Sequence, residues 1–487
     1  MPRSGPCRPT GWLTSISPMT AGTEASPITT PPTVDVPAVV AGLRKTYASG
    51  RTRSVEWRRG QLQALEKLMS ENEAAIADAL EQDLGRKPFE AWLADIASTA
   101  AEAHDAAKNV GKWMKRKHRR LEFSQLPGRG WIEYEPFGTV LVIGAWNFPF
   151  ALTLGPAVGA IAAGNTVLLK PSEVSAASSA LMARLIPQYL DSDAIAVVEG
   201  DGLVSQELIA QGFDYLCFTG GTEIGRKVYE AAAAHLTPVT LELGGKSPVI
   251  VAADADIDVA AKRIAWTKLI NSGQICIAPD YVLADASIRD ELVAKIGAAV
   301  ATFEAGGSGG KRIVNVRHFG RLTNALGATK GTIAVGGGSD AATIEIEPTV
   351  VVDPALDEPL MTDEIFGPIL PIVTVQNLDE AIAFVNARPK PLAAYLFTKA
   401  KSVRERVIKE VPAGGMLVNQ LLFQFSTSKL PFGGVGPSGM GAYHGKFGFE
   451  EFSHRKSVLT KPTRPDLSAI IYPPYTEKAW KLARRLF

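Results

Sequence analysis

One cysteine of this chain, Cys276, lies in the segment NSGQICIAPD (271–280), among small and polar residues. These surroundings are typical of a loop at a cleft, where a thiol can meet a ligand. A thiolate is a strong nucleophile and can form a covalent intermediate. A lone cysteine is more often a small buried side chain, so the segment alone leaves a catalytic and a structural interpretation open.

A second candidate is Glu242 in VTLELGGKSP (239–248), where the carboxylate ends an apolar run and two glycines follow. If this run is a strand of a parallel sheet, its carboxyl end faces the ligand cleft. A partly desolvated glutamate in that place has a raised pKa and can act as a general base. The alternative is a helix cap or an ion pair.

A third candidate is Asn147 in GAWNFPF (144–150), which follows another apolar run. An amide donor at the carboxyl end of a strand can form an oxyanion hole together with the backbone N–H of Cys276. The three side chains together would supply a nucleophile, a base and an oxyanion donor.

Two further segments suit a dinucleotide. In FTGGTEIGRKV (218–228), a strand is followed by Gly220, Gly225 and a helix, which exposes backbone N–H groups to a pyrophosphate. This spacing differs from GxGxxG and is weak evidence on its own. Lys170 and Glu173, in LLKPSE, end a neighbouring strand. A lysine there can hold a ribose hydroxyl or a phosphate, and a glutamate can accept from ribose hydroxyls.

The elements that must position these residues follow from an alternation of apolar runs and helical patterns over 139–245. The alternation predicts an α/β fold with a doubly wound parallel sheet, which binds ligands at the carboxyl ends of its strands. The stretch 136–169 carries no charged residue, but its prolines, asparagines and glycines favour a buried βαβ unit over a membrane span. The predicted strands are 140–144, 166–170, 194–199, 214–219 and 239–243, and the helices between them are 151–163, 176–190, 203–211 and 223–235.

Helices are also predicted before this sheet. Residues 55–84 have helical spacing, and Ser70 with Glu73 fits a capping box, which indicates two helices rather than one. A further helix is predicted over 89–117. The residues expected on the buried faces are Leu62, Leu65, Met69, Ile76 and Leu80 in the first segment and Phe89, Trp92, Leu93 and Ile96 in the second.

The composition narrows the class of protein. Lys plus Arg number 51 and Asp plus Glu 50, so the balance argues against a nucleic-acid-binding surface, and we interpret the basic run 111–120 as a solvated helix end. The 3 cysteines lack zinc-site spacing, which predicts no disulfide framework, no metal and a cytoplasmic location. Residues 1–36 lack the apolar core of a signal peptide and predict a disordered extension. A transit peptide or a start at Met19 is the alternative.

Several segments, taken together and in their order, resemble the aldehyde dehydrogenase superfamily. They are VLVIGAWNFPF, GNTVLLKPSE, FTGGTEIG, TLELGGKSP, NSGQICIAPDYVL, EIFGPILP and LPFGGVGPSGMGAYHGKFGFEEFSHRK. Within the superfamily the chain is most similar to the class 3 branch, which oxidises medium- and long-chain or aromatic aldehydes with NAD or NADP. The resemblance extends from about residue 45 to about residue 460.

The resemblance implies a mechanism through a cysteine thioester. Cys276 is implied as the nucleophile, Asn147 as the oxyanion donor and Glu242 as the base that activates water to hydrolyse the thioester. The implied coenzyme is NAD, with NADP also permitted, because Glu173 would repel a 2′-phosphate unless its side chain swings aside. The implied coenzyme contacts are Trp146, Lys170, Glu173, Gly220, Gly221, Thr222, Glu223, Ile224, Gly225, Glu364 and Phe366.

The same resemblance implies a homodimer and an order of domains along the chain. An NAD(P)-binding domain over 37–243 contains a bridging segment at about 118–138, and a catalytic α/β domain covers 244–419. A bridging and oligomerisation segment with the C-terminal tail covers 420–487. No transmembrane segment and no nucleic-acid partner are expected, and the expected partner besides the coenzyme is an aldehyde.

Three places depart from the family's pattern. Many members carry Ser or Asn where Gly221 stands, the segment 304–319 is shorter and richer in glycine, and Gln424 replaces a frequent His. Coenzyme contacts and aldehyde preference are therefore open. The alternatives are a coenzyme A-acylating dehydrogenase, a cysteine esterase and a non-enzymatic use of the fold. Glu242 would be superfluous in the first, and an intact catalytic set argues against the last.

Overall fold

The structure is a computed structural model that describes residues 34–307, 312–466, 468–469 and 472–486. Residues Val36–Phe487 form one compact unit. Most of the predicted extension, 1–36, lies outside the described residues. Its last residue, Val36, is buried as the first residue of helix α1 (Val36–Ala48).

A doubly wound sheet stands where the sequence predicts it, which confirms the fold class. Its strand order is β17-β7-β6-β3-β4-β5, and the five strands from β7 to β5 run parallel. The order reverses at β3, so the ligand crevice is expected at the carboxyl ends of β3 and β6. The strands are β3 (Thr139–Ile143), β4 (Thr166–Lys170), β5 (Ile195–Val197), β6 (Tyr215–Thr219), β7 (Val239–Glu242) and the antiparallel β17 (Gly439–Met440).

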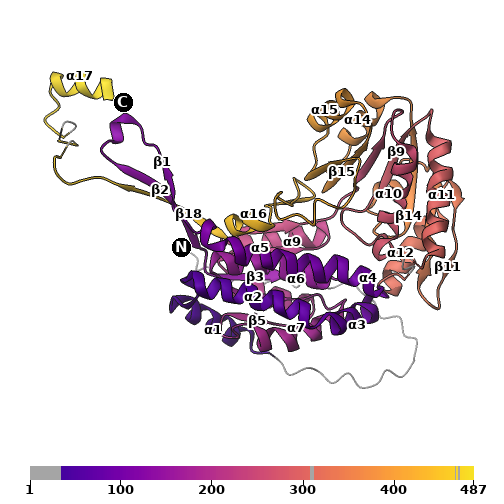
Figure 1. The fold of residues 1–487 in the computed structure, drawn as a ribbon, viewed down its shortest axis with the longest axis horizontal. Helices are drawn as coiled ribbons and strands as arrows, with labels where there is room; N and C mark the ends of the chain where they lie inside the picture. Colours follow the sequence, from indigo (N-terminus) through magenta and orange to yellow (C-terminus); the bar gives the residue numbers. More distant parts are fainter. Residues whose placement is uncertain (1–33, 308–311, 467, 470–471, 487) are drawn as a thin grey trace, which may run out of the picture. The chain divides into compact units, whose positions relative to one another are not determined.

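Helices cover both faces of this sheet. Alternate side chains of a strand point to opposite faces, and here the side chains on both faces are apolar. Val140 and Val142 of β3 pack with one group of helices, while Leu141 and Ile143 pack with the other. Helix α6 (Pro149–Ala163) is buried along its whole length, which accounts for the uncharged stretch 136–169. Figure 1 shows α2, α5 and α6 running alongside one another. The first group is α2 (Val55–Glu71), α3 (Glu73–Leu84), α5 (Ser98–Trp113), α6 and α7 (Ala176–Tyr189), and the second is α1, α8 (Gly202–Ile209) and α9 (Thr222–Ala233).

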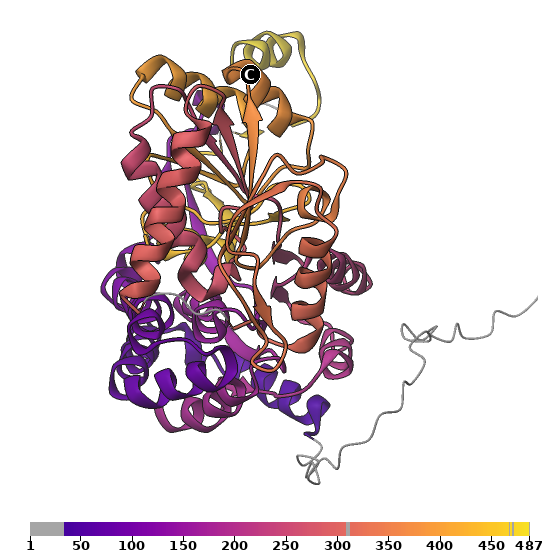
Figure 2. The same ribbon diagram turned by 90° about the vertical axis from the view of Figure 1, so that its right-hand side faces the viewer.

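A second α/β layer follows along the chain, as predicted. Its sheet has the order β10-β13-β14-β9-β8-β15-β16, with every neighbouring pair parallel except β10 with β13. Figure 2 shows α10 and α11 side by side on one face, and α14 and α15 pack on the other. The strands are β8 (Pro248–Val251), β9 (Tyr281–Asp285), β10 (Thr332–Val335), β13 (Thr349–Val352), β14 (Ile369–Val375), β15 (Ala393–Phe397) and β16 (Gly415–Val418). The helices are α10 (Ile257–Leu269), α11 (Arg289–Ala305), α12 (Val316–Gly327), α14 (Leu378–Asn386) and α15 (Lys401–Glu410).

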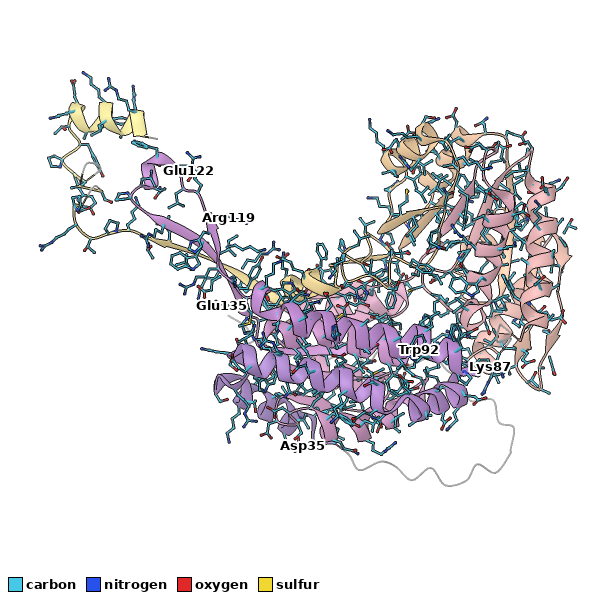
Figure 3. The ribbon with its side chains drawn as sticks, in the orientation of Figure 1. Asp35, Lys87, Trp92, Arg119, Glu122 and Glu135 are labelled. Carbon is cyan, nitrogen blue, oxygen red and sulfur yellow. The ribbon has the colours of Figure 1, made fainter. Side chains whose placement is uncertain are left out.

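A third, three-stranded sheet joins segments far apart in the sequence. Strand β2 (Arg129–Pro136) lies between β1 (Lys117–Arg119) and β18 (Ser453–Thr460), antiparallel to both. Arg119, Glu122 and Glu135 mark its course in Figure 3, away from the helices of the first sheet. Beyond it the chain ends in helix α17 (Glu477–Leu486). The domain boundaries given above stay a prediction.

Two helical predictions before the first sheet need correction. The break in 55–84 is real, but Asn72 separates α2 from α3, and the Ser70 hydroxyl donates to the Glu66 carbonyl instead of capping a helix. The predicted helix 89–117 consists of α4 (Pro88–Ala91), the π-helical turn η2 (Trp92–Ala97) and α5, which ends at Trp113.

The predicted buried face of that helix is also wrong in part. Ile96 is buried, but Phe89 is 70% exposed and Trp92 and Leu93 are each 42% exposed. The π-helical turn instead places Asp95 inward, where it pairs with Arg86. Figure 3 labels Trp92 on this segment. The basic run continues past α5 into β1, so its residues do not all lie at a helix end. Within the described ranges, no helix is both long and apolar enough to cross a bilayer.

Candidate active site

Cys276 follows a tight, left-handed stretch of backbone. Helix α10 ends at Leu269, and Asn271 and Ser272 have φ of 49° and 53°, a region that L-residues adopt at a cost and that is frequent at functional sites. The Cys276 side chain is half-buried. Burial raises the pKa of its thiol, the charges of Glu364 and Glu242 add to this, and nearby backbone N–H groups oppose it. These surroundings favour the neutral thiol over the thiolate.

Asn147 lies against the same loop. Its side-chain Nδ2 donates to the Gln274 carbonyl at 3.2 Å, two residues before Cys276. Asn271 Nδ2 donates to the Asn147 carbonyl at 3.1 Å, and Gln274 Nε2 donates to the Asn271 carbonyl at 2.9 Å. These buried amides hold the loop after β3 and the loop before Cys276 together. The structure thus brings two of the three predicted catalytic residues to one place.

A buried ion pair between Arg86 and Asp95, which the sequence analysis did not predict, contacts the backbone of Asn147. Arg86 donates both to the Asp95 carboxylate and to the Asn147 carbonyl, and the side chains of Arg86 and Asp95 are fully buried. Asp95 also accepts from the Ala151 N–H at 2.9 Å, in the first turn of α6. The Arg86 guanidinium lies 4.5 Å from the Phe148 ring centroid. The only available signal was an acid in the otherwise apolar segment WLADIA, with no basic neighbour in its helix.

Glu242 ends β7 in a dry environment. Its side chain is 3% exposed, and neither carboxyl oxygen has a hydrogen-bond partner among the described residues. Burial raises its pKa well above the usual range, and the charge of Glu451 adds to the shift. A carboxyl group held in this way has no structural bond to lose when its proton moves, which suits a general base.

Glu364 is a second carboxyl group near the same place. Burial raises its pKa to about 8, Asp280 adds to the shift, and the N–H of Gly245 opposes it. A Cβ at Gly244 would lie 1.9 Å from Glu364 Oε2, so a glycine is required where the two segments meet. Because Gly244 comes two residues after Glu242, this contact places the EIFGP segment beside the end of β7.

The EIFGP segment also brings together two predicted coenzyme contacts. The Trp146 and Phe366 rings meet edge to face with centroids 5.3 Å apart, and Phe366 has φ of 49°. Lys246 Nζ donates to the Asp363 carbonyl at 2.7 Å, and Arg321 donates to the Glu364 carbonyl at 3.1 Å. Both cations therefore hold the backbone of the EIFGP segment through hydrogen bonds to its carbonyl groups.

The predicted pyrophosphate turn joins β6 to α9. The residue at the N-cap of α9 is Gly221, which has no side chain to accept from the N–H groups of the first turn. A Cβ at Gly221 would face open space, whereas one at Gly225 would lie 2.4 Å from Leu243. Gly225 therefore lets the helix approach the sheet, while Gly221 leaves room above the turn. Thr222, Glu223 and Ile224 form the first turn of α9, and the Glu223 and Ile224 side chains point to solvent.

Lys170 and Glu173 form an ion pair at the end of β4, next to β3 in the sheet. Lys170 Nζ lies 2.7 Å from Glu173 Oε2, and the two side chains are 3% and 47% exposed. The uncapped turn of α9, the open space at Gly221 and this buried ammonium are the donor set a dinucleotide requires, so the residues fit NAD(P). Within the described parts of the chain, no three His, Cys, Asp or Glu side chains group as metal ligands.

Comparisons with known proteins show the family to which the chain belongs. The residue pattern that defines the aldehyde dehydrogenase family matches residues 10–458. Aldehyde dehydrogenase family 3 member A2 of Mus musculus is 44% identical over 443 residues, covering 90% of this chain and 91% of that protein. The dimeric NADP-preferring aldehyde dehydrogenase of Rattus norvegicus is 45% identical over 446 residues, covering 89% of this chain and 97% of that protein.

Solved structures show the same fold. The substrate-bound state of Staphylococcus aureus AldH superposes with a TM-score of 0.89 at 41% identity, covering 93% of this chain and 99% of that chain. A mutant of the indole-3-acetaldehyde dehydrogenase of P. syringae, in complex with NAD⁺ and IAA, superposes with a TM-score of 0.82 at 26% identity. That match covers 88% of this chain and 89% of the other.

Proposed function

Given that this chain belongs to the aldehyde dehydrogenase family and is an NAD(P)-dependent aldehyde dehydrogenase, we propose that it oxidises medium- and long-chain or aromatic aldehydes at Cys276. The observation that supports the site assignment is the bond from the Asn147 amide to the carbonyl of Gln274, two residues before Cys276. The apolar cluster that includes Cys276 also contains Phe148, Leu152 and Phe425, which suits an apolar aldehyde chain.

Attack of the Cys276 sulfur on the carbonyl carbon places negative charge on the aldehyde oxygen. Asn147 Nδ2 and the backbone N–H of Cys276 are the donors for this oxyanion. Arg86 and Asn271 both donate to the backbone carbonyl of Asn147, which fixes the main chain from which this side-chain donor extends. A preorganised donor of this kind contributes about 10²–10³ in rate.

The thiol has to lose its proton before it attacks. Its raised pKa means that the free protein stores Cys276 as the neutral thiol, which is less reactive than a thiolate. We propose that this proton leaves to solvent, because Cys276 is only half-buried, so that Glu242 is still the base when the thioester is hydrolysed.

Once bound, the coenzyme supplies the acceptor for the hydride of the tetrahedral adduct. Lys170 and Glu173 would hold its adenosine ribose, the first turn of α9 its pyrophosphate, and Trp146, Glu364 and Phe366 its nicotinamide side. Loss of the hydride leaves a thioester on Cys276. Glu242 then removes a proton from water, the hydroxide attacks the thioester carbonyl, and the acid leaves as the C–S bond breaks.

For coenzyme choice we propose NAD as the preferred form, with NADP accepted. Glu173 next to Lys170 disfavours a 2′-phosphate, but half of its side chain is exposed and free to turn aside. The NADP preference printed for the rat relative makes this a direct comparison to measure.

For assembly and location we propose a homodimer in the cytoplasm. The name of the rat relative describes it as dimeric, and here the edge strand β18 is exposed along most of its length. The catalytic role of Cys276 requires a reduced thiol, which suits a reducing compartment. Sedimentation of the purified protein and fractionation of cells test these two statements.

The test is formation of reduced coenzyme from hexanal, decanal and benzaldehyde, with NAD and NADP in parallel and without coenzyme A. We expect turnover with at least one aldehyde. Cys276→Ser is expected to lower kcat by about 10³-fold or more, because an alcohol is a far weaker nucleophile, while coenzyme binding measured by fluorescence is kept. Turnover retained in this variant, or turnover that requires coenzyme A, would contradict the proposal.

A further inference from the structure

Tyr395 lies in the middle of β15 and is buried, with 1% of its surface exposed. Alternate residues of a strand point to opposite faces of its sheet. Tyr395 belongs to the apolar cluster that the second sheet forms with α10 and α11, and Cys276 packs against the same cluster. The tyrosine ring therefore lies on the face of the sheet that carries the candidate nucleophile.

The Tyr395 hydroxyl joins two loops on this face. It donates to the Ile277 carbonyl at 2.6 Å, one residue after Cys276, and it accepts from Gln424 Nε2 at 3.3 Å. The backbone N–H of Leu422 is a further donor near the same oxygen. The hydroxyl thus gives its proton to the loop of Cys276 and offers its lone pairs to the loop 419–425.

Cys276 itself stands in a tight turn. The Ala278 N–H donates to the Ile275 carbonyl at 3.0 Å, so Cys276 and Ile277 are the central residues of this turn. Burial raises the pKa of the thiol, and the N–H groups of Cys276 and Ile277, which face the sulfur, oppose this rise. The direction of these N–H groups depends on the conformation of the turn.

Hydrogen bonds hold this turn from both ends. Before the turn, the Gln274 carbonyl accepts from the side-chain amides of Asn147 and Asn271. Inside the turn, the Ile277 carbonyl accepts from Tyr395. The first sheet therefore fixes the approach to Cys276, and the second sheet fixes the peptide that follows it.

Gln424 comes from a loop that is itself anchored. The Asn419 side chain accepts from the Thr398 N–H at 3.0 Å and donates to the Thr398 carbonyl at 2.9 Å. Gln424 is 9% exposed, and its amide N–H directs the phenolic proton of Tyr395 away from itself, toward Ile277. This is the position where the chain has glutamine in place of the family's frequent His.

We propose that Tyr395 and Gln424 are positioning residues for Cys276. Tyr395 fixes the turn through the Ile277 carbonyl, and Gln424 acts through Tyr395 by orienting its hydroxyl. The turn then keeps its N–H groups directed at the sulfur, including the Cys276 N–H that serves as an oxyanion donor. The inference rests on the proposed function and adds two residues to the support of its nucleophile.

The first test uses the thiol alone, without coenzyme or aldehyde. Iodoacetamide alkylates Cys276 when the thiolate attacks carbon and iodide leaves, and the rate is followed by mass spectrometry of the peptide that contains Cys276. Tyr395→Phe removes the hydroxyl and keeps the ring, so the rate is expected to fall about three- to tenfold. An unchanged or faster rate would overturn the proposal, because a loop that is only loosened exposes its thiol.

Tyr281→Phe is the matched control. Tyr281 is also 1% exposed and lies on β9 of the same sheet, but it belongs to the apolar cluster on the opposite face. The alkylation rate in this variant is expected to equal that of the native protein. An equal fall in both variants would be a general effect of removing a buried hydroxyl and would overturn the assignment of Tyr395.

A double variant tests whether Gln424 acts through Tyr395. Gln424→Met keeps the length of the side chain and removes the donor, so alkylation is expected to slow about twofold. Combined with Tyr395→Phe, it should cause no further loss, because the two residues act as one chain of hydrogen bonds. Losses that multiply fully in the double variant would overturn the role of Gln424.

Turnover separates this inference from the proposed function. Where an aldehyde is oxidised, Tyr395→Phe should lower kcat by a factor similar to that of alkylation, while KM changes less. A loss confined to KM would place Tyr395 in substrate binding and overturn the proposal. If the native protein oxidises no aldehyde, the proposed function fails, and the alkylation rates still decide whether Tyr395 positions Cys276.

Discussion

Asn147 and Glu242 are both 3% exposed at the carboxyl end of the same sheet, yet their surroundings differ. The Asn147 amide donates to Gln274, and its carbonyl accepts from Arg86 and Asn271. Both Glu242 carboxyl oxygens lack a partner among the described residues. In the proposed mechanism, this contrast separates a group whose geometry must persist from one whose proton must move. Bonds preorganise the first, and they would hold the second in a single protonation state.

Glu242→Gln is expected to give the largest loss on this side of the comparison. The amide keeps the shape but cannot take a proton, so hydrolysis of the thioester falls by about 10²–10⁴-fold. A burst of reduced coenzyme equal to the enzyme concentration should remain before the slow steady state. A steady state as fast as in the native protein would remove Glu242 from its role.

Asn147→Ala removes the preorganised donor. We expect kcat to fall by about 10²–10³-fold while KM changes less, because the amide acts on charge that develops only in the transition state. In contrast to Glu242→Gln, the burst itself should slow. A loss confined to KM would show that Asn147 binds the ground state instead.

Variants of Arg86 separate two contributions of this residue, the hydrogen bond to the Asn147 carbonyl and the buried ion pair with Asp95. Arg86→Met leaves Asp95 buried without its partner and should lower the free energy of unfolding by about 3–5 kcal/mol. Arg86→Lys keeps a charge near Asp95 but cannot span both acceptors, so stability falls less while kcat still falls. Urea unfolding and kcat are measured on both. Native kcat in Arg86→Lys would show that the bond to the Asn147 carbonyl has no positioning role.

Glu364 is tested by the pH dependence of stability rather than by a reaction rate. Its pKa is about 8 in the folded protein and near 4.5 when unfolded, so the folded state binds more protons between these values. Its contribution to stability is therefore fully present below about pH 4.5 and is lost as the pH rises to about 8, at most ~1.4 kcal/mol per pH unit. Glu364→Gln should flatten this slope in denaturation at pH 5 to 9. An unchanged slope would show that Glu364 is ionised throughout.

Much of the fold could be predicted because the signals are local. Short apolar runs predicted the strands at 140–144 and 166–170, and helical spacing of apolar residues predicted the buried face of 55–84. The residues of that face are all buried in the structure: Leu62, Leu65, Met69, Ile76 and Leu80. The candidate residues Asn147 and Glu242 stand at ends of predicted strands, and parallel strands bring their carboxyl ends to one edge. The roles of these residues nevertheless stay proposals.

The errors have a shared physical cause. Phe89 and Trp92 fit a helical stripe, but the π-helical turn that begins at Trp92 changes the helical period, and Asp95 faces inward, where it pairs with Arg86. Periodicity reports which residues are apolar and says nothing of a partner on another segment. A buried charge is stable only when paired, so its position depends on contacts the pattern does not contain.

The amino-acid sequence alone predicts the parallel sheet and the buried helix after β3. It also supplies the residue types that can attack a carbonyl, transfer a proton and bind a coenzyme. Which of them meet depends on how the elements pack, because helices α5 and α16 (Gly445–Glu451) bring together residues as distant as Glu102 and Gly445, 343 positions apart. Local periodicity encodes the elements, whereas their packing decides which distant side chains come into contact.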